Sequence, residues 1–357
     1  MTTPSIIAIR DAEISGNAGA FYSPAKEKAA NRDKSPFVFI HRFAVFRRLR
    51  NSFKFKLLLL VVLFVLCGVV LFASKFGPYM GWHVHSSSSV FDSSRGGYTV
   101  LINTWKRNSL LKQSIAHYAS CRGTDAIHVV WSDSDPPSDN LKAYMDNVVL
   151  SKSRTSKPDL IFDVNIENNL NNRFKPIGDL RTDAIFSVDD DVIVPCDTLD
   201  FAFTVWQTAP STMVGFVPRM HWLSEKQNGN SYNKYGGWWS VWWFGTYSMV
   251  LSKAAFFHQK YLDIYTTQMT ASIRDYITRE RNCEDIAMSL LVANSTSAPP
   301  IWVKGKVYEI GSFGISSLND HSSKRNKCLN DFISLYGTVP LVSTNVKAVD
   351  SRNEWFW

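Results

Sequence analysis

Apolar runs alternate with helical patterns along the first part of the chain that follows residue 97. Four runs rich in β-branched and aromatic residues predict strands at 98–105, 126–133, 159–165 and 184–191. Between the first two, residues 109–120 place Leu111, Ile115 and Tyr118 on one face of a helix. This alternation predicts an α/β fold with a mostly parallel sheet. Ligands of such sheets bind beyond the carboxyl ends of the strands.

A different apolar pattern lies nearer the N-terminus. Residues 57–73 are all apolar apart from one glycine and carry neither charge nor proline. As a helix this run would be roughly 25 Å long, at the short end of what crosses a bilayer. A buried core helix would normally show a polar face, and a cleaved signal peptide would not follow more than fifty residues. The sequence therefore predicts a transmembrane signal-anchor at 57–74.

The net charge of +8 is concentrated before this run. Residues 1–56 hold eleven Lys or Arg against four acids, and the rest of the chain is nearly neutral. This location argues against a nucleic-acid partner. By the positive-inside rule it predicts a single-pass type II protein with a cytosolic N-terminus, and the short span suits Golgi or endoplasmic reticulum membranes. The expected organisation is a basic tail (1–56), the anchor (57–74), a Ser-rich lumenal stalk (75–96) and a lumenal domain (97–357).

Cysteines and a glycosylation pattern are consistent with a lumenal location. Cys67 lies in the apolar run, which leaves an even number of cysteines for an oxidising compartment: Cys121, Cys196, Cys283 and Cys328. Three full pairings are possible, and spacing does not choose among them. Asn294 begins an Asn-Ser-Thr acceptor pattern for N-glycosylation.

Three consecutive aspartates, Asp189, Asp190 and Asp191, end the last of the four apolar runs. Their mutual repulsion requires either a cation or solvation. A solvated acidic turn is the simpler interpretation, but the position at a strand end favours a metal. Oxygens of Asp189 and Asp191 suit Mg²⁺ or Mn²⁺ bridging a diphosphate. The first strand-to-helix turn lacks a glycine-rich phosphate loop, which disfavours dinucleotide-binding and P-loop folds.

A second acidic pair, Glu284 and Asp285, begins a helical pattern that continues to residue 291. Acids in a first helical turn interact favourably with the helix dipole, and Asn282 could cap the helix. On spacing alone this structural explanation is favoured.

The stretch 232–248 combines four tryptophans with Gly236 and Gly237. It fits either a hydrophobic core strand or a loop that carries an aromatic platform. Such a platform suits a sugar face or a lipid headgroup near the membrane.

Five segments in order resemble the exostosin-like glycosyltransferases (family 64), and within them the plant enzymes that mannosylate glycosylinositol phosphorylceramides: "SVDDDVIVPCDTLDFAFTVWQ", "TMVGFVPR", "GTYSMVLSKAAFF", "NCEDIAMSLL" and "KAVDSRNEWFW". The resemblance covers roughly residues 97–357. It implies a GT-A (nucleotide-diphospho-sugar transferase) fold, a Golgi location, a Mn²⁺-dependent DxD motif and transfer with retention of configuration. The implied donor is GDP-mannose, and the implied acceptor is a glucuronosyl inositol phosphorylceramide.

The resemblance also implies roles for single residues. Asp191 matches the principal metal ligand, with Asp189 beside it, and Asp189 and Asp190 match positions that touch the ribose and phosphates. The other implied donor-binding residues are Asn103, Arg107, Ser132, Asn168, Arg173, Glu284, Asp285 and Arg325. Asn103 stands where related N-acetylhexosamine transferases have glutamine, and Ser132 with Asp133 stands where they have two asparagines. These departures are compatible with a guanine donor.

Asp285 aligns with the family's catalytic aspartate, and Arg325 with an arginine that reaches the donor diphosphate. Cys328 matches a cysteine that pairs with Cys283. Either the leaving phosphate takes the acceptor's proton, or Asp285 is the nucleophile of a double displacement. Two other functions stay open: a UDP-N-acetylhexosamine transferase acting on a glycan, and a lumenal binding or adhesion module with a structural metal.

Overall fold

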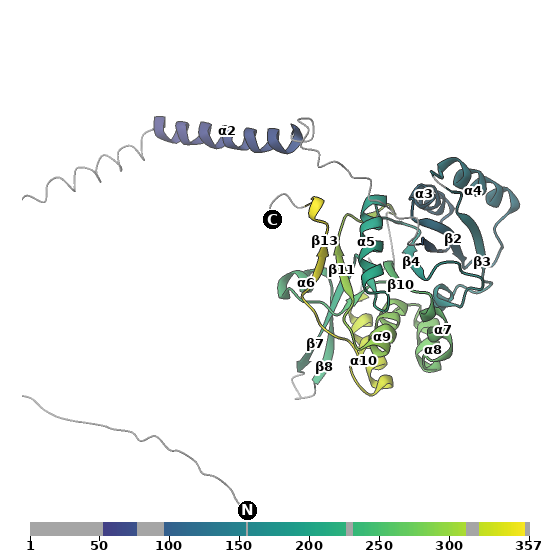
Figure 1. Ribbon diagram of the computed structural model, residues 1–357. Helices are drawn as coiled ribbons and strands as arrows, with labels where there is room; N and C mark the ends of the chain where they lie inside the picture. Colours follow the sequence, from purple (N-terminus) through teal and green to yellow (C-terminus); the bar gives the residue numbers. More distant parts are fainter. Residues whose placement is uncertain (1–52, 77–95, 155, 226–230, 312–320, 354–357) are drawn as a thin grey trace, which may run out of the picture. The chain divides into compact units, whose positions relative to one another are not determined.

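The computed structural model describes residues 53–76, 96–154, 156–225, 231–311 and 321–353 (Figure 1). The chain divides into two units, Met1–His83 and Val84–Trp357. Most of the predicted tail and stalk lies outside the described residues.

The elements follow one another in this order: α2 (Phe53–Phe76), β1 (Tyr98–Thr104), α3 (Asn108–Tyr118), β2 (Thr124–Trp131), α4 (Asp139–Lys152), β3 (Asp159–Val164), η3 (Leu170–Phe174), β4 (Ala184–Asp189), β5 (Val192–Ile193), α5 (Cys196–Thr208), β6 (Val214–Gly215), β7 (Pro218–Glu225), β8 (Ser231–Gly236), α6 (Trp238–Phe244), β9 (Met249–Val250), β10 (Ala254–His258), α7 (Lys260–Thr267), α8 (Ala271–Glu280), α9 (Glu284–Thr296), β11 (Ile301–Lys304), β12 (Tyr308–Glu309), α10 (His321–Tyr336), β13 (Lys347–Val349) and η5 (Ser351–Asn353).

Helix α2 of the first unit covers the segment for which the sequence predicts a membrane span. Among the described residues, however, no helix combines the length and the apolar character needed to cross a membrane. The predicted span is therefore not found in the structure.

The second unit is built on an eight-stranded sheet of order β13-β11-β6-β10-β4-β1-β2-β3. Strand β1 pairs in parallel with β2 and β4, and β2 pairs in parallel with β3. Only β10 runs antiparallel to its neighbours in this sheet. The predicted α/β fold with a mostly parallel sheet is confirmed, and the four predicted strands correspond to β1, β2, β3 and β4.

Two hydrophobic cores cover the two faces of the sheet, because successive side chains of a strand point in opposite directions. In β1, Leu101 packs into one core while Val100 and Ile102 pack into the other. Helices α3, α4 and α5 contribute to the core of Val100, and helices α7, α8, α9 and α10 to the core of Leu101. Because both faces of the sheet are buried, the sequences of its central strands are continuous apolar runs.

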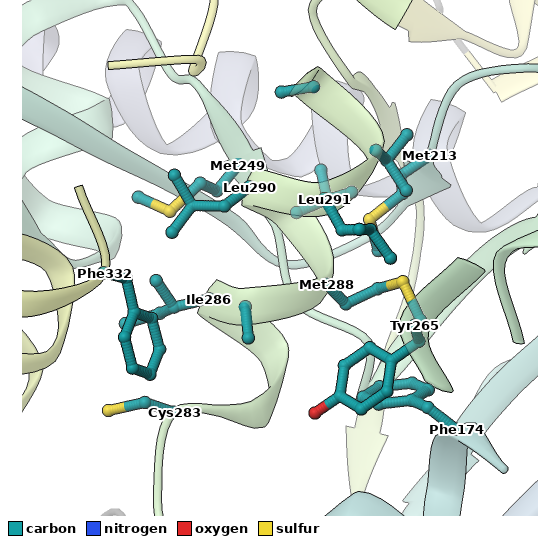
Figure 2. Packing of buried hydrophobic residues seen from close by; sticks show 14 of the residues in the cluster. Phe174, Met213, Met249, Tyr265, Cys283, Ile286, Met288, Leu290, Leu291 and Phe332 are labelled. Carbon is teal, nitrogen blue, oxygen red and sulfur yellow. The ribbon is translucent and has the colours of Figure 1, made fainter. Parts of the chain in front are cut away.

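Helix α9 is buried from Asp285 to Ala293, which fixes its position against the sheet. Figure 2 shows Ile286 and Met288 leaving the helix in opposite directions, toward Phe332 and toward Tyr265. A helix packed on all sides holds the residues of its first turn in a defined place.

Two disulfides are present, Cys121–Cys196 and Cys283–Cys328. The second is the pairing that the resemblance implied, and it joins the residue before α9 to the middle of α10. Cys67 is free and exposed.

Removing the α9–α10 disulfide with Cys283→Ala and Cys328→Ala is expected to lower the free energy of unfolding by about 3–4 kcal/mol, because the bond closes a loop of 45 residues. Thermal unfolding of the variant and of the control Cys67→Ser measures this, and the control is expected to leave the melting temperature unchanged. Peptide mapping that found Cys283 free in the wild-type chain would contradict the pairing.

The Trp-rich stretch is neither a core strand nor a loop. Strand β8 ends at Gly236, Gly237 caps α6, and Gly245 in a left-handed conformation (φ 68°) ends it. A Cβ at Gly236 would lie 2.6 Å from the side chains of Met220 and Trp222, so only glycine fits between β8 and β7 at that point. The glycines therefore permit a tight strand-to-helix connection, and the tryptophans form a short helix.

Candidate active site

Several sequence-predicted residues gather at the carboxyl ends of three adjacent strands. Asn103 at the end of β1 lies opposite Asp189 at the end of β4, in the register of the two parallel strands. Ser132 follows β2, and its amide donates to the carbonyl of Thr104 at 3.4 Å. The structure thus places them where α/β sheets bind ligands.

Each of the three aspartates is paired with a cation or a hydroxyl. Arg173 of η3 donates to Asp189. Arg107, just before α3, pairs with Asp190 and donates to Oδ2 of Asp191 at 2.8 Å. Thr104 donates to Asp190 at 2.6 Å. Two arginines therefore supply the positive charge that the sequence analysis expected beside the aspartates, although that analysis assigned it to a metal.

Burial separates the roles of the three carboxylates. Asp190 is fully buried, and burial raises its pKa to about 6 even though Thr104 and Arg107 favour its charged form. The side chains of Asp189 and Asp191 are 26% and 18% exposed. The chain therefore closes Asp190 off from solvent, while Asp189 and Asp191 can meet a ligand from solvent.

The donor set of Asp189 and Asp191 fits a hard divalent cation. Arg173 occupies Oδ1 of Asp189 and Arg107 occupies Oδ2 of Asp191, and no hydrogen bond from the described residues reaches the other oxygen of either group. Mg²⁺ and Mn²⁺ are commonly held by one or two carboxylates together with substrate phosphates. Gly311 lies against the Asp191 side chain, where a Cβ would come within 2.9 Å of its Cβ and Oδ2.

A His and Cys cluster elsewhere does not fit a metal. Among the described residues, the ligand atoms of His117, Cys121 and Cys196 lie within 4.8 Å of one another. The two cysteines form a disulfide, which removes the thiolates that a metal would need.

The segment before and within η3 is tied to the ends of β1 and β2. Asn172 donates to the hydroxyl of Ser132 at 3.2 Å. With its amide oxygen turned toward them, Asn168 accepts from Nε1 of Trp105 at 3.0 Å and from Arg281. Asn168, Arg173 and Ser132 are therefore brought to the same edge of the sheet.

The start of α9 carries a buried ion pair. Nη1 of Arg325 in α10 donates to both carboxylate oxygens of Asp285, at 2.8 and 2.9 Å. The same nitrogen donates to the hydroxyl of Tyr235 in β8 at 3.3 Å. Burial works against the charge of Asp285, but Arg325 and the Ile286 amide lower its pKa below the ordinary value. Asp285 is thus kept ionised inside the protein.

Glu284 lies beside this ion pair, and its pKa is shifted in the opposite direction to that of Asp285. Burial, followed by the charge of Asp285, raises the pKa of Glu284 to about 7. The helix begins after Cys283, which adopts a left-handed conformation, whereas the Asn282 side chain accepts from the amide of Cys283 rather than from the helix. The possible capping role of Asn282 is therefore wrong.

Arg173 brings the two acidic sites together. It donates to Asp189, and the charges of Asp189, Glu284 and Asp285 raise its pKa above the ordinary value although burial opposes this. The strand-end aspartates and the helix-start acids therefore surround one arginine.

Glu284→Gln is expected to change how stability depends on pH. Between about pH 4.5 and 7 the folded protein keeps a proton on Glu284 that the unfolded chain has lost, so this group's contribution to stability falls as pH rises through that window. Glutamine does not titrate. The melting temperature of the variant should therefore rise relative to wild type across the window, as thermal scans at several pH values would measure.

The matched control for this experiment is Glu280→Gln, which changes an exposed acid at the end of α8. It is expected to shift the melting temperature equally at every pH. The same pH-independent shift in Glu284→Gln would show that Glu284 does not titrate in this window.

Sequence reasoning missed four side chains that hold the site. Thr104 fixes Asp190, Tyr235 contacts Arg325, and Trp105 and Arg281 contact Asn168. Thr104 ends β1 and Trp105 begins the β1-to-α3 turn, and this position at the carboxyl end of a strand was a usable signal. Nothing in the local sequence marks Tyr235 or Arg281, because their contacts join distant segments.

Asn294 is exposed near the end of α9, so its side chain is accessible. Glycosylation of Asn294 stays a prediction.

A model of a protein family, described as the glycosyl transferase family 64 domain, matches residues 98–355. The matched region includes the strand-end aspartates, the start of α9 and Arg325.

Curated proteins show the same similarity. The chain is 58% identical over 311 residues to glycosylinositol phosphorylceramide mannosyl transferase 1 of Arabidopsis thaliana, covering 86% of this chain and 91% of the relative. It is 33% identical over 253 residues to exostosin-2 of Homo sapiens, covering 69% of this chain and 33% of that protein. It is 37% identical over 181 residues to exostosin-1 of Drosophila melanogaster, covering 50% of this chain and 23% of that protein.

Proposed function

Because the chain belongs to glycosyl transferase family 64, we propose that it transfers mannose from GDP-mannose to a glucuronosyl inositol phosphorylceramide, with retention of configuration. The similarity to the Arabidopsis mannosyl transferase, over nearly the whole of both chains, carries this proposal. In the same proposal, residues 97–357 are the GT-A catalytic domain. The phosphorylceramide acceptor places the reaction in sphingolipid glycosylation.

The acidic strand end would hold the donor. Asp191 and Asp189 are the proposed ligands of Mn²⁺, whose role is to neutralise the diphosphate of the donor. Arg107 and Arg173 lie within the same cluster and are proposed to add positive charge to the phosphate side of the site. Asn103, Ser132 and Asn168 line the same edge and are proposed donor contacts.

The start of α9 would face the sugar. Asp285 is kept ionised by Arg325, so its charge is available when positive charge develops at the anomeric carbon. One guanidinium nitrogen binds both of its oxygens, which makes the carboxylate a weaker nucleophile. This favours the mechanism in which the leaving phosphate takes the acceptor's proton over the double displacement. Glu284 is proposed to contact the sugar.

The proposal includes anchoring in the Golgi membrane with the catalytic domain in the lumen. It rests on the apolar run 57–73, on the basic residues before it and on the lipid nature of the acceptor. The described apolar side chains of α2, from Leu57 to Val70, are exposed. If residues 57–74 anchor the chain, alkaline carbonate should leave it in the membrane pellet, and release into the supernatant would refute the anchor.

A donor screen tests the reaction. The purified full chain in detergent is incubated with Mn²⁺, the glucuronosyl inositol phosphorylceramide acceptor and a series of GDP- and UDP-sugars. Turnover is expected with GDP-mannose and only in the presence of the metal. Turnover restricted to UDP-N-acetylhexosamines would establish the alternative donor. Folded protein that binds metal but turns over no donor would favour a binding module.

A further inference from the structure

Five aromatic side chains of α6 form an exposed surface, here called the α6 patch: Trp238, Trp239, Trp242, Trp243 and Phe244. Each is between 48% and 77% exposed. Neighbouring indole rings contact one another in a chain from Trp238 to Trp243. Single exposed aromatics are ordinary, but a contiguous group of five marks a binding surface.

The α6 patch does not arise from poor packing of the helix. Val241 alone is buried among the residues of α6, while Phe244 also contacts the ring of Trp222 in β7. The helix lies at the margin of the domain, between the glycines that open and close it (Figure 1). The other residues of α6, apart from Ser240, are aromatics that face outward.

Ring geometry distinguishes between possible occupants. A sugar platform presents a ring face, yet the Trp238–Trp239 and Trp239–Trp242 pairs meet edge to face, at 81° and 86°. Rings set at such angles do not form one flat face. This arrangement suits the interfacial layer of a bilayer, where tryptophan has an apolar body among acyl chains and a polar group near water.

A cation lies next to the α6 patch. The ring of Phe244 is 5.8 Å from that of Trp222, and Nζ of Lys234 lies 5.5 Å from the centre of the Trp222 ring. Lys234 is exposed. An aromatic surface with an adjacent lysine is complementary to lipids whose headgroups carry phosphate.

Strand β8 connects the α6 patch to the candidate active site. Tyr235, which accepts a hydrogen bond from Arg325, is separated from Trp238 by Gly236 and Gly237 alone. Arg325 in turn binds Asp285. A surface that lies on the membrane at α6 would therefore hold the site at a fixed, short distance from the lipid headgroups.

We propose that the α6 patch docks the catalytic domain on a bilayer surface that contains anionic phospholipids, with the tryptophans in the interfacial layer. Its role in presenting a lipid acceptor rests on the proposed function, whereas the docking does not. An anchor at 57–74 would hold the chain at a membrane without fixing which face of the catalytic domain meets the lipid. The α6 patch would then set the height and orientation of the domain.

Fluorescence quenching tests the docking without any turnover. In a Cys67→Ser background, a thiol-reactive fluorophore is attached at Trp239→Cys on α6 or, as the control, at Tyr144→Cys on α4, which is also exposed. The full chain is reconstituted in phosphatidylcholine and phosphatidylinositol vesicles that carry lipids brominated near the headgroup. Quenching is expected at 239 and not at 144. Equal quenching at both positions, or none at 239, would overturn the proposal.

Protection of the 239 probe from aqueous iodide without quenching by brominated lipid would also overturn it, because a protein surface would then cover the α6 patch.

An activity assay tests the role in acceptor presentation. The double variant Trp239→Ser and Trp243→Ser is expected to lower kcat/KM for the acceptor in vesicles by about tenfold and to leave kcat/KM for the water-soluble glycosyl inositol phosphate headgroup unchanged. An equal loss with both acceptors would mean that the rings bind sugar, and would overturn the proposal. If no mannosyl transfer is found at all, the proposed function fails while the quenching result still decides the docking.

Discussion

Replacing Asp285 with asparagine is expected to lower kcat by about a hundredfold or more while the KM for the donor changes little. Asparagine keeps the shape of the side chain and removes the charge that is needed when the anomeric carbon becomes cationic. The ground state of the donor uses this charge much less, so binding should persist. Steady-state kinetics with GDP-mannose and the phosphorylceramide acceptor measure both constants.

The ion pair with Arg325 adds a stability cost to this variant. Both side chains are almost fully buried, and breaking a buried pair by removing one charge typically costs about 3–5 kcal/mol. The assay is therefore run well below the measured melting temperature. Asp331→Asn is the control, since it removes an aspartate of α10 that pairs with Lys327 at the surface. A kcat like that of wild type in folded Asp285→Asn would place the catalytic group elsewhere.

Asp191→Asn is expected to weaken Mn²⁺-dependent binding of the donor by about tenfold or more, because one carboxylate ligand is lost from a two-carboxylate site. Affinity measured without metal should change little, since Arg107 keeps its pairing with Asp190. Calorimetric titration of GDP-mannose with and without Mn²⁺ measures the two donor affinities separately.

Asp163→Asn provides the comparison for this titration. Asp163 also lies near the end of a parallel strand, β3, but it pairs with His128 at 3.2 Å and lies outside the acidic cluster. The Asp163→Asn variant is expected to bind GDP-mannose as tightly as wild type, both with and without Mn²⁺. If Asp191→Asn retained the full effect of Mn²⁺ on donor affinity, Asp191 would not be a metal ligand.

Strands β1 to β4 could be predicted because a strand that is buried on both faces of a sheet needs a continuous run of apolar residues. Helix α3 could be predicted from the spacing of Leu111, Ile115 and Tyr118, all of which are buried. Helix α6 could not, because its tryptophans face outward and give no helical period. The antiparallel direction of β10 could not be predicted either, because the direction of a strand depends on the path of the chain that precedes it.

The strand-end aspartates could be selected as a candidate site from their position, but their partners could not. Arg107 and Arg173 reach them from segments 84 and 16 residues away, and no local pattern encodes such pairing. The disulfide Cys283–Cys328 came from family resemblance rather than from spacing. Long-range contacts of this kind follow from the fold as a whole.

The position of Arg173 between two groups of acids means that the two groups are energetically coupled. Above about pH 7, where Glu284 is ionised, removal of Asp189 leaves more of the charge of Arg173 to Glu284 and Asp285, and removal of Glu284 leaves more to Asp189. Effects of substitutions on the two sides should therefore fail to add, as neighbouring charged groups commonly do. A double-mutant cycle with Asp189→Asn and Glu284→Gln would give a coupling energy that vanishes once Arg173 is replaced. The phosphate side and the sugar side of the site would then respond to a donor as one electrostatic unit.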